Sequence, residues 1–409
     1  MSMNSIIPPA PLAAPGTQSE SGPGVTNPAR DVSSPRGSAD VPAASQSFAL
    51  GLWRIAAADV SSGNQVSLLH NGPAAFDEMV DLIDRSSKTI ALESYIFRSD
   101  EVGGRIADAL IAAVNRGVEV RLLIDWIGSR ETSRSFLRRL RNAGIQLAVF
   151  NPVGFRPWFG IVPRDHRKLL VVDERVGITG GMNIGHEWTR GLRRPRGMGW
   201  RDTAVKIDGP AAHDMTQAFE RMWRRTLGQE RRGSHRFLRR QAHGAHLEPA
   251  THEPALVGIV EGEPLRLRVS RALQIQAISA RHSIWLATAY FTPSPSEVEA
   301  LNGAARDGVD VRVLVPSRND HPWVTMLTRR YYRRLLANGV RIWEWQGEMM
   351  HAKTSVIDGR WLRVGSTDVN PLGVAINYEL DAVIEDQSLG QQAEQMFLAD
   401  LEQSREVTL

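Results

Sequence analysis

The stretch DHRKLLVVDERVGITGGMN occupies residues 165–183, and MHAKTSVIDGRWLRVGSTD at residues 350–368 repeats its arrangement. In each stretch a lysine follows a histidine at a gap of two positions. Only four of the 409 residues are lysines and eleven are histidines, so chance predicts roughly 0.1 such pairs. The repetition therefore indicates a duplicated unit with a shared task.

The two stretches agree position by position. Counted from each histidine, they share Lys at +2, Asp at +7, Gly at +14, Gly or Ser at +15 and Asn or Asp at +17. These positions are His166, Lys168, Asp173, Gly180, Gly181 and Asn183 in the first copy, and His351, Lys353, Asp358, Gly365, Ser366 and Asp368 in the second. Alternate residues of a strand share a face, so each histidine projects beside its lysine.

The duplication extends into the flanking sequence. The resembling pairs are TIALESYIF (89–97) with SIWLATAYF (283–291), RGVEVRLLID (116–125) with DGVDVRVLVP (307–316), and NAGIQLAVF (142–150) with ANGVRIWEW (337–345). Short apolar runs alternate with helix-like stretches, which is typical of parallel strands joined by right-handed crossovers. We therefore expect an α/β protein of two similar α-β-α halves, with the active site between them.

Changes in amino-acid composition along the chain predict the domain boundaries. Residues 1–48 are rich in Pro, Ala, Ser and Gly and predict a disordered tail, because such a segment buries too little apolar surface to offset its ordering entropy. The first half is expected at 49–250 and the second at 251–409, with the basic, histidine-containing stretch 229–255 as the joint.

Composition narrows the class of protein. The net charge of +4 is compatible with nucleic acid, an anionic membrane surface or a phosphate-bearing substrate as partner. Cysteine is absent, which excludes disulfides, cysteine metal sites and a cysteine nucleophile. The sequence has no run of 18 apolar residues, so no membrane-spanning helix is expected. The N-terminus does not match a signal peptide.

An imidazole beside an ammonium group suits phosphoryl chemistry. The lysine neutralises non-bridging oxygens, and a neutral histidine can attack phosphorus and hold it covalently. A second histidine can protonate the leaving alcohol and later deprotonate the incoming one. Two copies of one unit supply both roles if the halves face each other. No Gly-rich nucleotide loop or metal cluster is found, so we expect neither cofactor nor metal.

The two units resemble the HxK(x4)D motifs of the phospholipase D superfamily. Their flanks are most similar to bacterial cardiolipin synthases, particularly the form without N-terminal membrane helices. The supporting stretches include LESYIF, WRDTAVKIDGP, FERMW, LLANGVRIWEW, VGSTDVNPLG and NYEL. The resemblance spans about residues 65–400.

The resemblance implies two-step transfer through a phosphatidyl-histidine. By similarity His166 is the nucleophile and His351 the acid and base, although the sequence leaves the reverse assignment open. The motif adds Lys168, Lys353, Asp173 and Asp358 to the catalytic set, but the two aspartates fall in turns where we expect them to bond the backbone. Substrate-binding positions are Asn183, Ser366, Asp368 and Asn370. The orienting carboxylates come from the opposite halves: Glu379 for His166 and Asp202 for His351.

One departure from the family pattern concerns the second copy. The usual run is GSxNxD, whereas this chain reads GSTDVN, with Asp368 and Asn370 exchanged. A carboxylate aimed at a phosphodiester repels it unless a base compensates. Either Asp368 turns away, or Asn370 substitutes for it, or the second half is weakened.

Four functions remain open. The first is cardiolipin synthesis from two phosphatidylglycerols, with glycerol released, by a peripheral protein on the cytoplasmic face of the bacterial inner membrane. The others are hydrolysis by a phospholipase D, nuclease activity, and a non-enzymatic membrane scaffold. Phosphatidylglycerol at a membrane surface is the favoured partner over nucleic acid, and the oligomeric state stays undetermined.

Several other residues and segments each allow two interpretations, one functional and one structural. Glu93 either lines the site or is a structural carboxylate. The aromatic loop at 155–164 either dips into lipid headgroups or packs under a loop. Basic runs, which either attract an anionic bilayer or form a solvated face, lie at 190–197, 230–240 and 328–334. The histidines not expected to be catalytic are His186, His213, His282 and His321.

Overall fold

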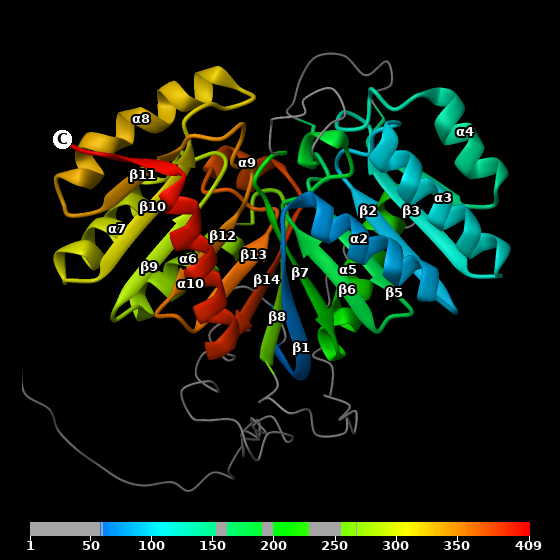
Figure 1. The fold of residues 1–409 in the computed structure, drawn as a ribbon, viewed down its shortest axis with the longest axis horizontal. Helices are drawn as coiled ribbons and strands as arrows, with labels where there is room; N and C mark the ends of the chain where they lie inside the picture. Colours follow the sequence, from blue (N-terminus) through cyan, green and yellow to red (C-terminus); the bar gives the residue numbers. More distant parts are fainter. Residues whose placement is uncertain (1–57, 59, 153–161, 190–198, 229–254, 267) are drawn as a thin grey trace, which may run out of the picture. The chain divides into compact units, whose positions relative to one another are not determined.

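A computed structural model describes residues 58, 60–152, 162–189, 199–228, 255–266 and 268–409. These residues build a 15-stranded sheet with helices on both faces (Figure 1). The sheet order is β15-β11-β10-β9-β12-β13-β14-β8-β1-β7-β6-β5-β2-β3-β4. Within these ranges, no helix is long and apolar enough to cross a bilayer.

The elements of the first half are β1 (Val60–His70), α2 (Asn71–Arg85), β2 (Thr89–Ser94), α3 (Glu101–Asn115), β3 (Glu119–Asp125), α4 (Arg134–Asn142), β4 (Gln146–Phe150), β5 (Lys168–Val172), β6 (Val176–Gly180), the short 3-10 helix η1 (His186–Trp188), β7 (Thr203–Asp208) and α5 (Pro210–Thr226). Three parallel strands, β2, β3 and β4, precede the antiparallel series β5, β6 and β7.

The second half repeats this order. Its elements are β8 (Ala255–Gly262), α6 (Arg268–Ser279), β9 (Ser283–Ala287), α7 (Pro295–Arg306), β10 (Asp310–Pro316), α8 (Pro322–Leu336), β11 (Arg341–Trp345), β12 (Thr354–Ile357), β13 (Trp361–Gly365), α9 (Pro371–Ile376), β14 (Glu379–Glu385), α10 (Gln387–Glu402) and β15 (Ser404–Val407). Antiparallel pairing of β1 with β8 joins the two halves into one sheet. The predicted fold of two similar α/β halves is confirmed.

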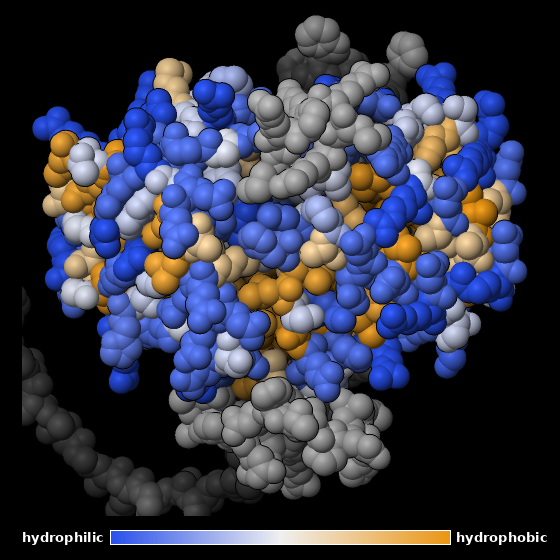
Figure 2. Space-filling model, viewed as in Figure 1, coloured by the Kyte–Doolittle hydropathy of each residue, from blue (hydrophilic) through white to orange (hydrophobic). Residues whose placement is uncertain are grey.

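Strand alternation explains the layers. In β2, Ile90 and Leu92 pack in the cluster that contains α2 and α3 residues, whereas Ala91 packs in the cluster that contains α5. Successive strand residues point to opposite faces, so a nearly continuous apolar strand needs cover on both sides. Polar residues cover most of the face drawn in Figure 2, and apolar residues gather between α10 and α2 over the central strands.

Glycines end the equivalent crossover helices. Gly117 follows α3 and Gly308 follows α7, and both have a φ of 90°. This left-handed conformation is costly for residues with a Cβ and is common where a helix terminates. The repeated letters RGVEV and DGVDV therefore mark helix ends that lead directly into β3 and β10.

Asp173 and Asp358 hold equivalent turns at the end opposite the histidines. Asp173 accepts hydrogen bonds from the backbone amides of Ser87, Lys88 and Thr89 at 2.7–2.9 Å. Asp358 likewise accepts from the amides of Arg281, His282 and Ser283 at 2.7–2.9 Å. Seven residues of extended chain span roughly 20 Å, which separates each aspartate from its histidine. Their inclusion in the catalytic set is therefore corrected: they fasten each β-hairpin turn to the neighbouring strand.

Several predicted features lie outside the described residues. They are the tail at 1–48, most of the aromatic loop at 155–164, and the basic runs at 190–197 and 230–240. The boundaries expected at residues 48 and 250 also fall there, so they stay predictions.

We predict that Asp173→Ala lowers stability by about 2–3 kcal/mol, because three backbone amides lose their charged acceptor. The thermal midpoint measured by circular dichroism should fall by several degrees. Glu174→Ala is the matched control, since Glu174 shares the left-handed backbone with a φ of 57°. Equal losses in the two variants would contradict the hydrogen-bond explanation.

Candidate active site

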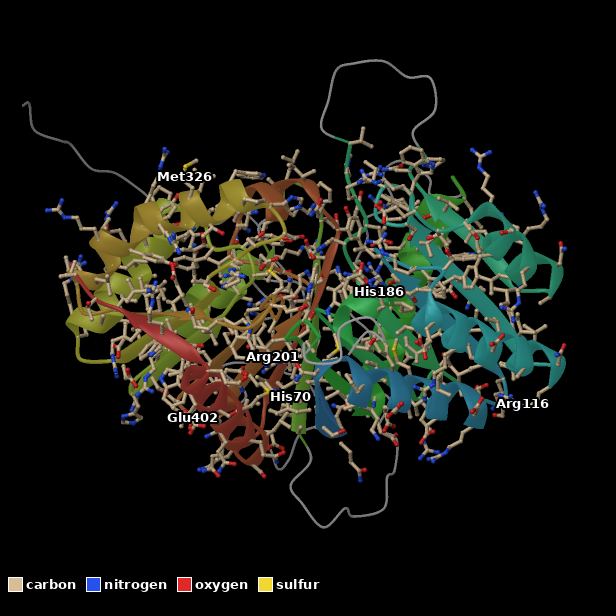
Figure 3. All side chains as sticks on the ribbon, turned by 45° about the horizontal axis from the view of Figure 1, so that its top comes forward. His70, Arg116, His186, Arg201, Met326 and Glu402 are labelled. Carbon is tan, nitrogen blue, oxygen red and sulfur yellow. The ribbon has the colours of Figure 1, made fainter. Side chains whose placement is uncertain are left out.

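Backbone hydrogen bonds between the halves place the two histidines. The His166 amide donates to the Tyr378 carbonyl at 2.9 Å, and the His351 amide donates to the Arg201 carbonyl at 2.7 Å. Each acceptor directly precedes the carboxylate residue that resemblance pairs with that histidine. Figure 3 shows Arg201 in the middle of the molecule, between the two halves. Reciprocal pairing thus brings each His-Lys segment against the opposite half.

Each imidazole lies beside a carboxylate from the other half. His166 Nδ1 is 3.0 Å from Glu379 Oε2, and His351 Nδ1 is 2.8 Å from Asp202 Oδ2. These are the pairs expected from the sequence. Because Nδ1 is engaged in each ring, Nε2 is the nitrogen available to a substrate.

Both carboxylates are held in turn. Ser366 Oγ donates to Glu379 Oε2 at 2.5 Å, and Trp188 Nε1 donates to Asp202 Oδ2 at 2.8 Å. At Gly181, a Cβ atom would stand 2.2 Å from Asp202 Oδ1, so a side chain does not fit there. The difference between Gly181 and Ser366 at the +15 position therefore follows from how each half supports its carboxylate.

The two lysines are arranged alike. Lys168 Nζ donates to the His166 carbonyl at 2.5 Å, and Lys353 Nζ donates to the His351 carbonyl at 2.6 Å. Both side chains are buried. Their ammonium groups lie 5.3 Å from the Tyr95 ring centroid and 5.6 Å from that of Tyr290, respectively. An ammonium group has three donors, so each lysine keeps donors beyond this backbone bond that can bind an anion.

Burial sets the charge state of this cluster. Burial, followed by the charges of Lys168 and Lys353, holds the pKa of His166 well below its usual range. Burial and then Lys353 do the same to the pKa of His351. Burial also lowers the pKa of Lys168 to about 7. Without substrate, both imidazoles are therefore neutral at neutral pH, and Lys168 carries only part of its charge near pH 7.

Burial raises the pKa of both partner carboxyls, to different extents. The pKa of Asp202 rises to about 6, whereas that of Glu379 is held well above its usual range. Asp202 is consequently ionised above pH 6 and stabilises a proton on His351. Each histidine thus faces a buried carboxyl group whose pKa is raised.

Asp368 occupies the place of Asn183. Asn183 Oδ1 accepts from the Ile96 amide at 3.0 Å, and Asp368 Oδ1 accepts from the Tyr290 amide at 2.9 Å. Ile96 and Tyr290 are matching positions of the repeated segments 89–97 and 283–291. Asp368 also accepts from Thr288 Oγ1 at 2.8 Å, so it is anchored to the end of β9.

The second oxygen of Asp368 faces the cluster. Asp368 Oδ2 lies 3.4 Å from Lys353 Nζ, which partly neutralises it. Asn370 stands instead at the start of α9, where its carbonyl accepts the Val374 amide at 3.0 Å. The exchange of Asp and Asn therefore leaves Asp368 in the motif position, paired with a base.

The family of the chain follows from comparison with known proteins. The family described as "Cardiolipin synthase, PLD-like domain" matches residues 79–223 and 274–401. The chain belongs to this family. The cardiolipin synthase of Oceanobacillus iheyensis is 32% identical over 349 residues, covering 85% of this chain and 71% of that protein. Cardiolipin synthase 2 of Bacillus anthracis is 33% identical over 359 residues, covering 87% and 68%. The chain is a phospholipase D-type phosphatidyltransferase.

Solved structures agree on the fold. The crystal structure of phosphatidylserine synthase from Haemophilus influenzae Rd KW20 aligns with a TM-score of 0.66 at 14% identity, over 88% of this chain and 92% of that one. Polyphosphate kinase from Porphyromonas gingivalis aligns with a TM-score of 0.55 at 15% identity, over 84% of this chain and 48% of that one. Both alignments show that this chain shares its fold with these two proteins.

Aromatic side chains surround the histidines, and none of them belongs to the repeated His-Lys motifs. Tyr95 lies 5.0 Å from the His166 ring, and Trp188, Trp200 and Tyr290 lie 5.4, 5.7 and 6.4 Å from the His351 ring, as distances between centroids. Tyr95 and Tyr290 stand within the repeated SYIF and TAYF segments. The aromatic residue at the end of each repeated strand was the sequence feature that could have indicated these site residues.

Glu93 is a structural carboxylate. It is 1% exposed and lies 2.9 Å from Arg167 Nε. Arg167 also reaches Glu261 of β8 at 3.4 Å, so this buried network ties β2 to the second half. Through Arg167, Glu93 supports the segment that carries His166.

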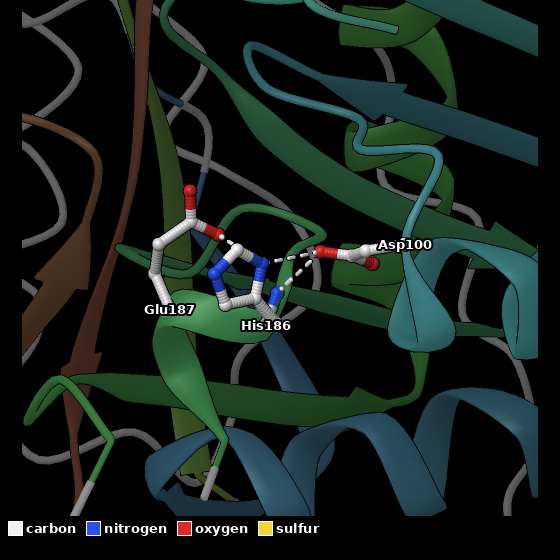
Figure 4. Close-up of side chains that lie close together, drawn as sticks. All are labelled: Asp100, His186 and Glu187. Carbon is white, nitrogen blue, oxygen red and sulfur yellow. Dashed lines mark hydrogen bonds and ion pairs between the residues drawn. The ribbon is translucent and has the colours of Figure 1, made fainter. Parts of the chain in front are cut away.

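His186 anchors a loop. Its amide and Nδ1 are 2.7 and 2.9 Å from Asp100 Oδ2, while Asp100 Oδ1 caps α3 through the Gly103 amide (Figure 4). Glu187 lies beside it and pairs with Arg98 at 3.0 Å. Asp100, His186 and Glu187 come close enough to hold a cation, but the helix cap and the ion pair explain this cluster.

We predict that one of the four lysine ammonium signals titrates near pH 7 in a ¹⁵N-lysine NMR experiment, since burial lowers the pKa of Lys168 to about 7. The signal should be lost above that pH as the amine becomes neutral. Lys168→Met should remove this signal and thereby assign it. The matched control is Lys206→Met, because Lys206 forms a half-buried surface ion pair with Glu78. Four signals that all persist to pH 9 would refute the expected shift.

Proposed function

We propose that the chain is a cardiolipin synthase that moves a phosphatidyl group from one phosphatidylglycerol to the glycerol headgroup of another. The observation that carries the proposal is the pair of imidazoles, each held at Nδ1 by a carboxyl group from the opposite half. Two free Nε2 atoms, flanked by two buried lysines, match a double displacement at phosphorus.

In the first step, the His166 Nε2 lone pair attacks phosphorus and the bond to the glycerol oxygen breaks. His351, which is an imidazolium once the anionic phosphodiester is bound, gives its Nε2 proton to that oxygen, so glycerol leaves and phosphatidyl-histidine remains. In the second step, His351 takes the proton from a hydroxyl group of a second phosphatidylglycerol. The resulting oxygen attacks phosphorus, the P–N bond breaks, and cardiolipin leaves with His166 neutral again.

The environment supports this assignment of roles. The acid must hold a proton in the first step, and an ionised Asp202 stabilises an imidazolium at His351. The nucleophile needs a lone pair on Nε2, so the Nδ1 of His166 carries the proton and donates it in a hydrogen bond to Glu379. The incoming phosphodiester adds negative charge near both rings, which raises the affinity of His351 for its proton.

Lys168 and Lys353 bind the non-bridging oxygens through their remaining donors. Ser366 acts through Glu379, to which it donates. Asn183 and Asp368 act on the strand ends that carry Ile96 and Tyr290, and thereby shape the anion site. Asp368 in addition competes with the phosphate for Lys353.

Transfer to an alcohol is favoured over hydrolysis by the aromatic wall around His351. The rings of Trp188, Trp200 and Tyr290 lie within 6.4 Å of it, and its side chain is 5% exposed. Such a lining limits the water that His351 can activate for attack on the phosphatidyl group of His166. We propose that the protein works peripherally, on the cytoplasmic face of the membrane that holds its substrate.

The central test incubates purified protein with phosphatidylglycerol vesicles and identifies products by mass spectrometry. We expect cardiolipin and glycerol in equal amounts. His351→Ala should lose about 10²–10⁴-fold in rate, because the acid and base are removed. His166→Ala should yield no product, and exposed His282→Ala is the control that keeps full rate.

The other products decide between the alternatives. Phosphatidic acid without cardiolipin would replace the transferase by a hydrolase. Cleavage of an oligonucleotide without any lipid product would replace it by a nuclease. Undiminished product from His351→Ala would overturn the role given to the second His-Lys unit.

We further predict that Asp368→Asn lowers the KM for phosphatidylglycerol by about fivefold, because Lys353 then no longer shares its charge with a carboxylate. The amide keeps the hydrogen bond to the Tyr290 amide. Steady-state kinetics on wild type and variant measure the change, with Asp310→Asn, whose carboxylate pairs with Arg312, as control. A higher KM in Asp368→Asn would show that the carboxylate assists binding.

A further inference from the structure

The outer face of α8 exposes two large apolar side chains. Trp323 keeps 56% and Met326 59% of its surface accessible. Figure 3 shows Met326 projecting outward from the helix. The opposite side of α8 packs on the sheet through Val324, Thr328, Tyr332 and Leu335. These two side chains therefore lie outside the buried side of α8.

Two arginines continue the same face. At 3.6 residues per turn, Trp323, Met326, Arg330 and Arg333 fall within an arc of about 80°. Arg330 and Arg333 are exposed and have no ion-pair partner in the part of the chain that the structure describes. Their neighbours differ, since Arg329 pairs with Glu344 and Arg334 with Glu299. The outer face of α8 thus carries two apolar residues followed by two exposed arginines.

This face begins at the catalytic end of the molecule. The Trp323 ring lies 6.4 Å from His321, His321 lies 6.1 Å from Tyr290, and Tyr290 lies 6.4 Å from His351, as centroid distances. Asp320, next to His321, accepts the Tyr290 hydroxyl at 2.9 Å. A continuous series of rings therefore leads from the first turn of α8 to the second His-Lys unit.

The first half exposes apolar side chains at its matching end. Trp126 directly follows β3, just as α8 follows β10, and it is exposed. Val162 is also exposed and stands four residues before His166. Both halves thus carry exposed apolar groups where the parallel strands end, on the side of the histidines.

We propose that the outer face of α8 docks on an anionic phospholipid bilayer. Trp323 and Met326 enter the headgroup zone, where a tryptophan ring and an apolar side chain are both stabilised. Arg330 and Arg333 bind lipid phosphates beside them. The inference deepens the proposed function, on which it rests for the lipid as substrate, because docking here holds the entrance to His351 against the membrane.

A bilayer fits this face better than a nucleic acid does. Base stacking would use the tryptophan and the arginines, but it would gain nothing from an exposed methionine. The apolar pair stands closer to the site than the arginines do, as expected for a surface that receives lipid from a membrane. Nucleic-acid binding remains a distinguishable outcome of the test.

The test measures co-sedimentation of the full chain with vesicles of phosphatidylglycerol and phosphatidylethanolamine, and with phosphatidylcholine vesicles as the neutral comparison. We expect tight binding to the anionic vesicles only. Trp323→Ser with Met326→Ser should weaken it about tenfold or more, and Arg330→Gln with Arg333→Gln about 10- to 30-fold.

The matched control is Ile278→Ser. Ile278 is 81% exposed and stands near the end of α6, five residues before Ser283, whose amide binds Asp358 at the end opposite the histidines. Circular dichroism melts establish that all variants are folded. Loss of vesicle binding in Ile278→Ser equal to that in the α8 variants would overturn the proposal.

A second assay separates docking from chemistry. With short-chain phosphatidylglycerol dissolved as monomers, the α8 variants should transfer at the wild-type rate, although they are slow on vesicles. If the wild type does not transfer on monomers but its vesicle binding still depends on α8, the proposed function is rejected and the docking face is kept. Unchanged vesicle binding, with loss of binding to a single-stranded oligonucleotide, would overturn the docking face in favour of nucleic acid.

Discussion

The site depends on reciprocal pairing between the halves. The amides of His166 and His351 bond to the carbonyls of Tyr378 and Arg201, one residue before the carboxylate that each imidazole needs. Neither half is complete alone, because each histidine takes its Nδ1 partner from the other half. Burying such groups is costly unless they are paired, so the contact between halves and the chemistry of the site have the same physical basis.

The duplicated halves have diverged in how they surround their histidines. Behind His166, Glu93 and Arg167 form a buried ion pair that extends to Glu261. The matching positions of Glu93 and Arg167 in the second half are Ala287 and Ala352, which pack in an apolar cluster with tryptophans. Buried charges therefore support the segment of His166, whereas apolar and aromatic packing supports the segment of His351.

The charge balance of the site suits an anionic substrate. Two buried ammonium groups face two histidines whose pKa values are held below their usual range, and the carboxyl groups of Glu379 and Asp202 have raised pKa values. A bound phosphodiester supplies the missing negative charge and stabilises the lysines and the protonated imidazole together. The substrate thus completes an electrostatic arrangement that the protein alone leaves unfavourable.

Sequence alone determined the repeat, the two α/β halves and the His-Lys pairs, because strand alternation and fixed offsets are local properties of the chain. Resemblance indicated the pairs His166–Glu379 and His351–Asp202, but only the backbone pairing between halves explains them. The place of Asp368 against Lys353, the aromatic wall around His351 and the free face of α8 were decided by tertiary structure. Each of these depends on which distant strand ends meet, and local pattern carries no information about that.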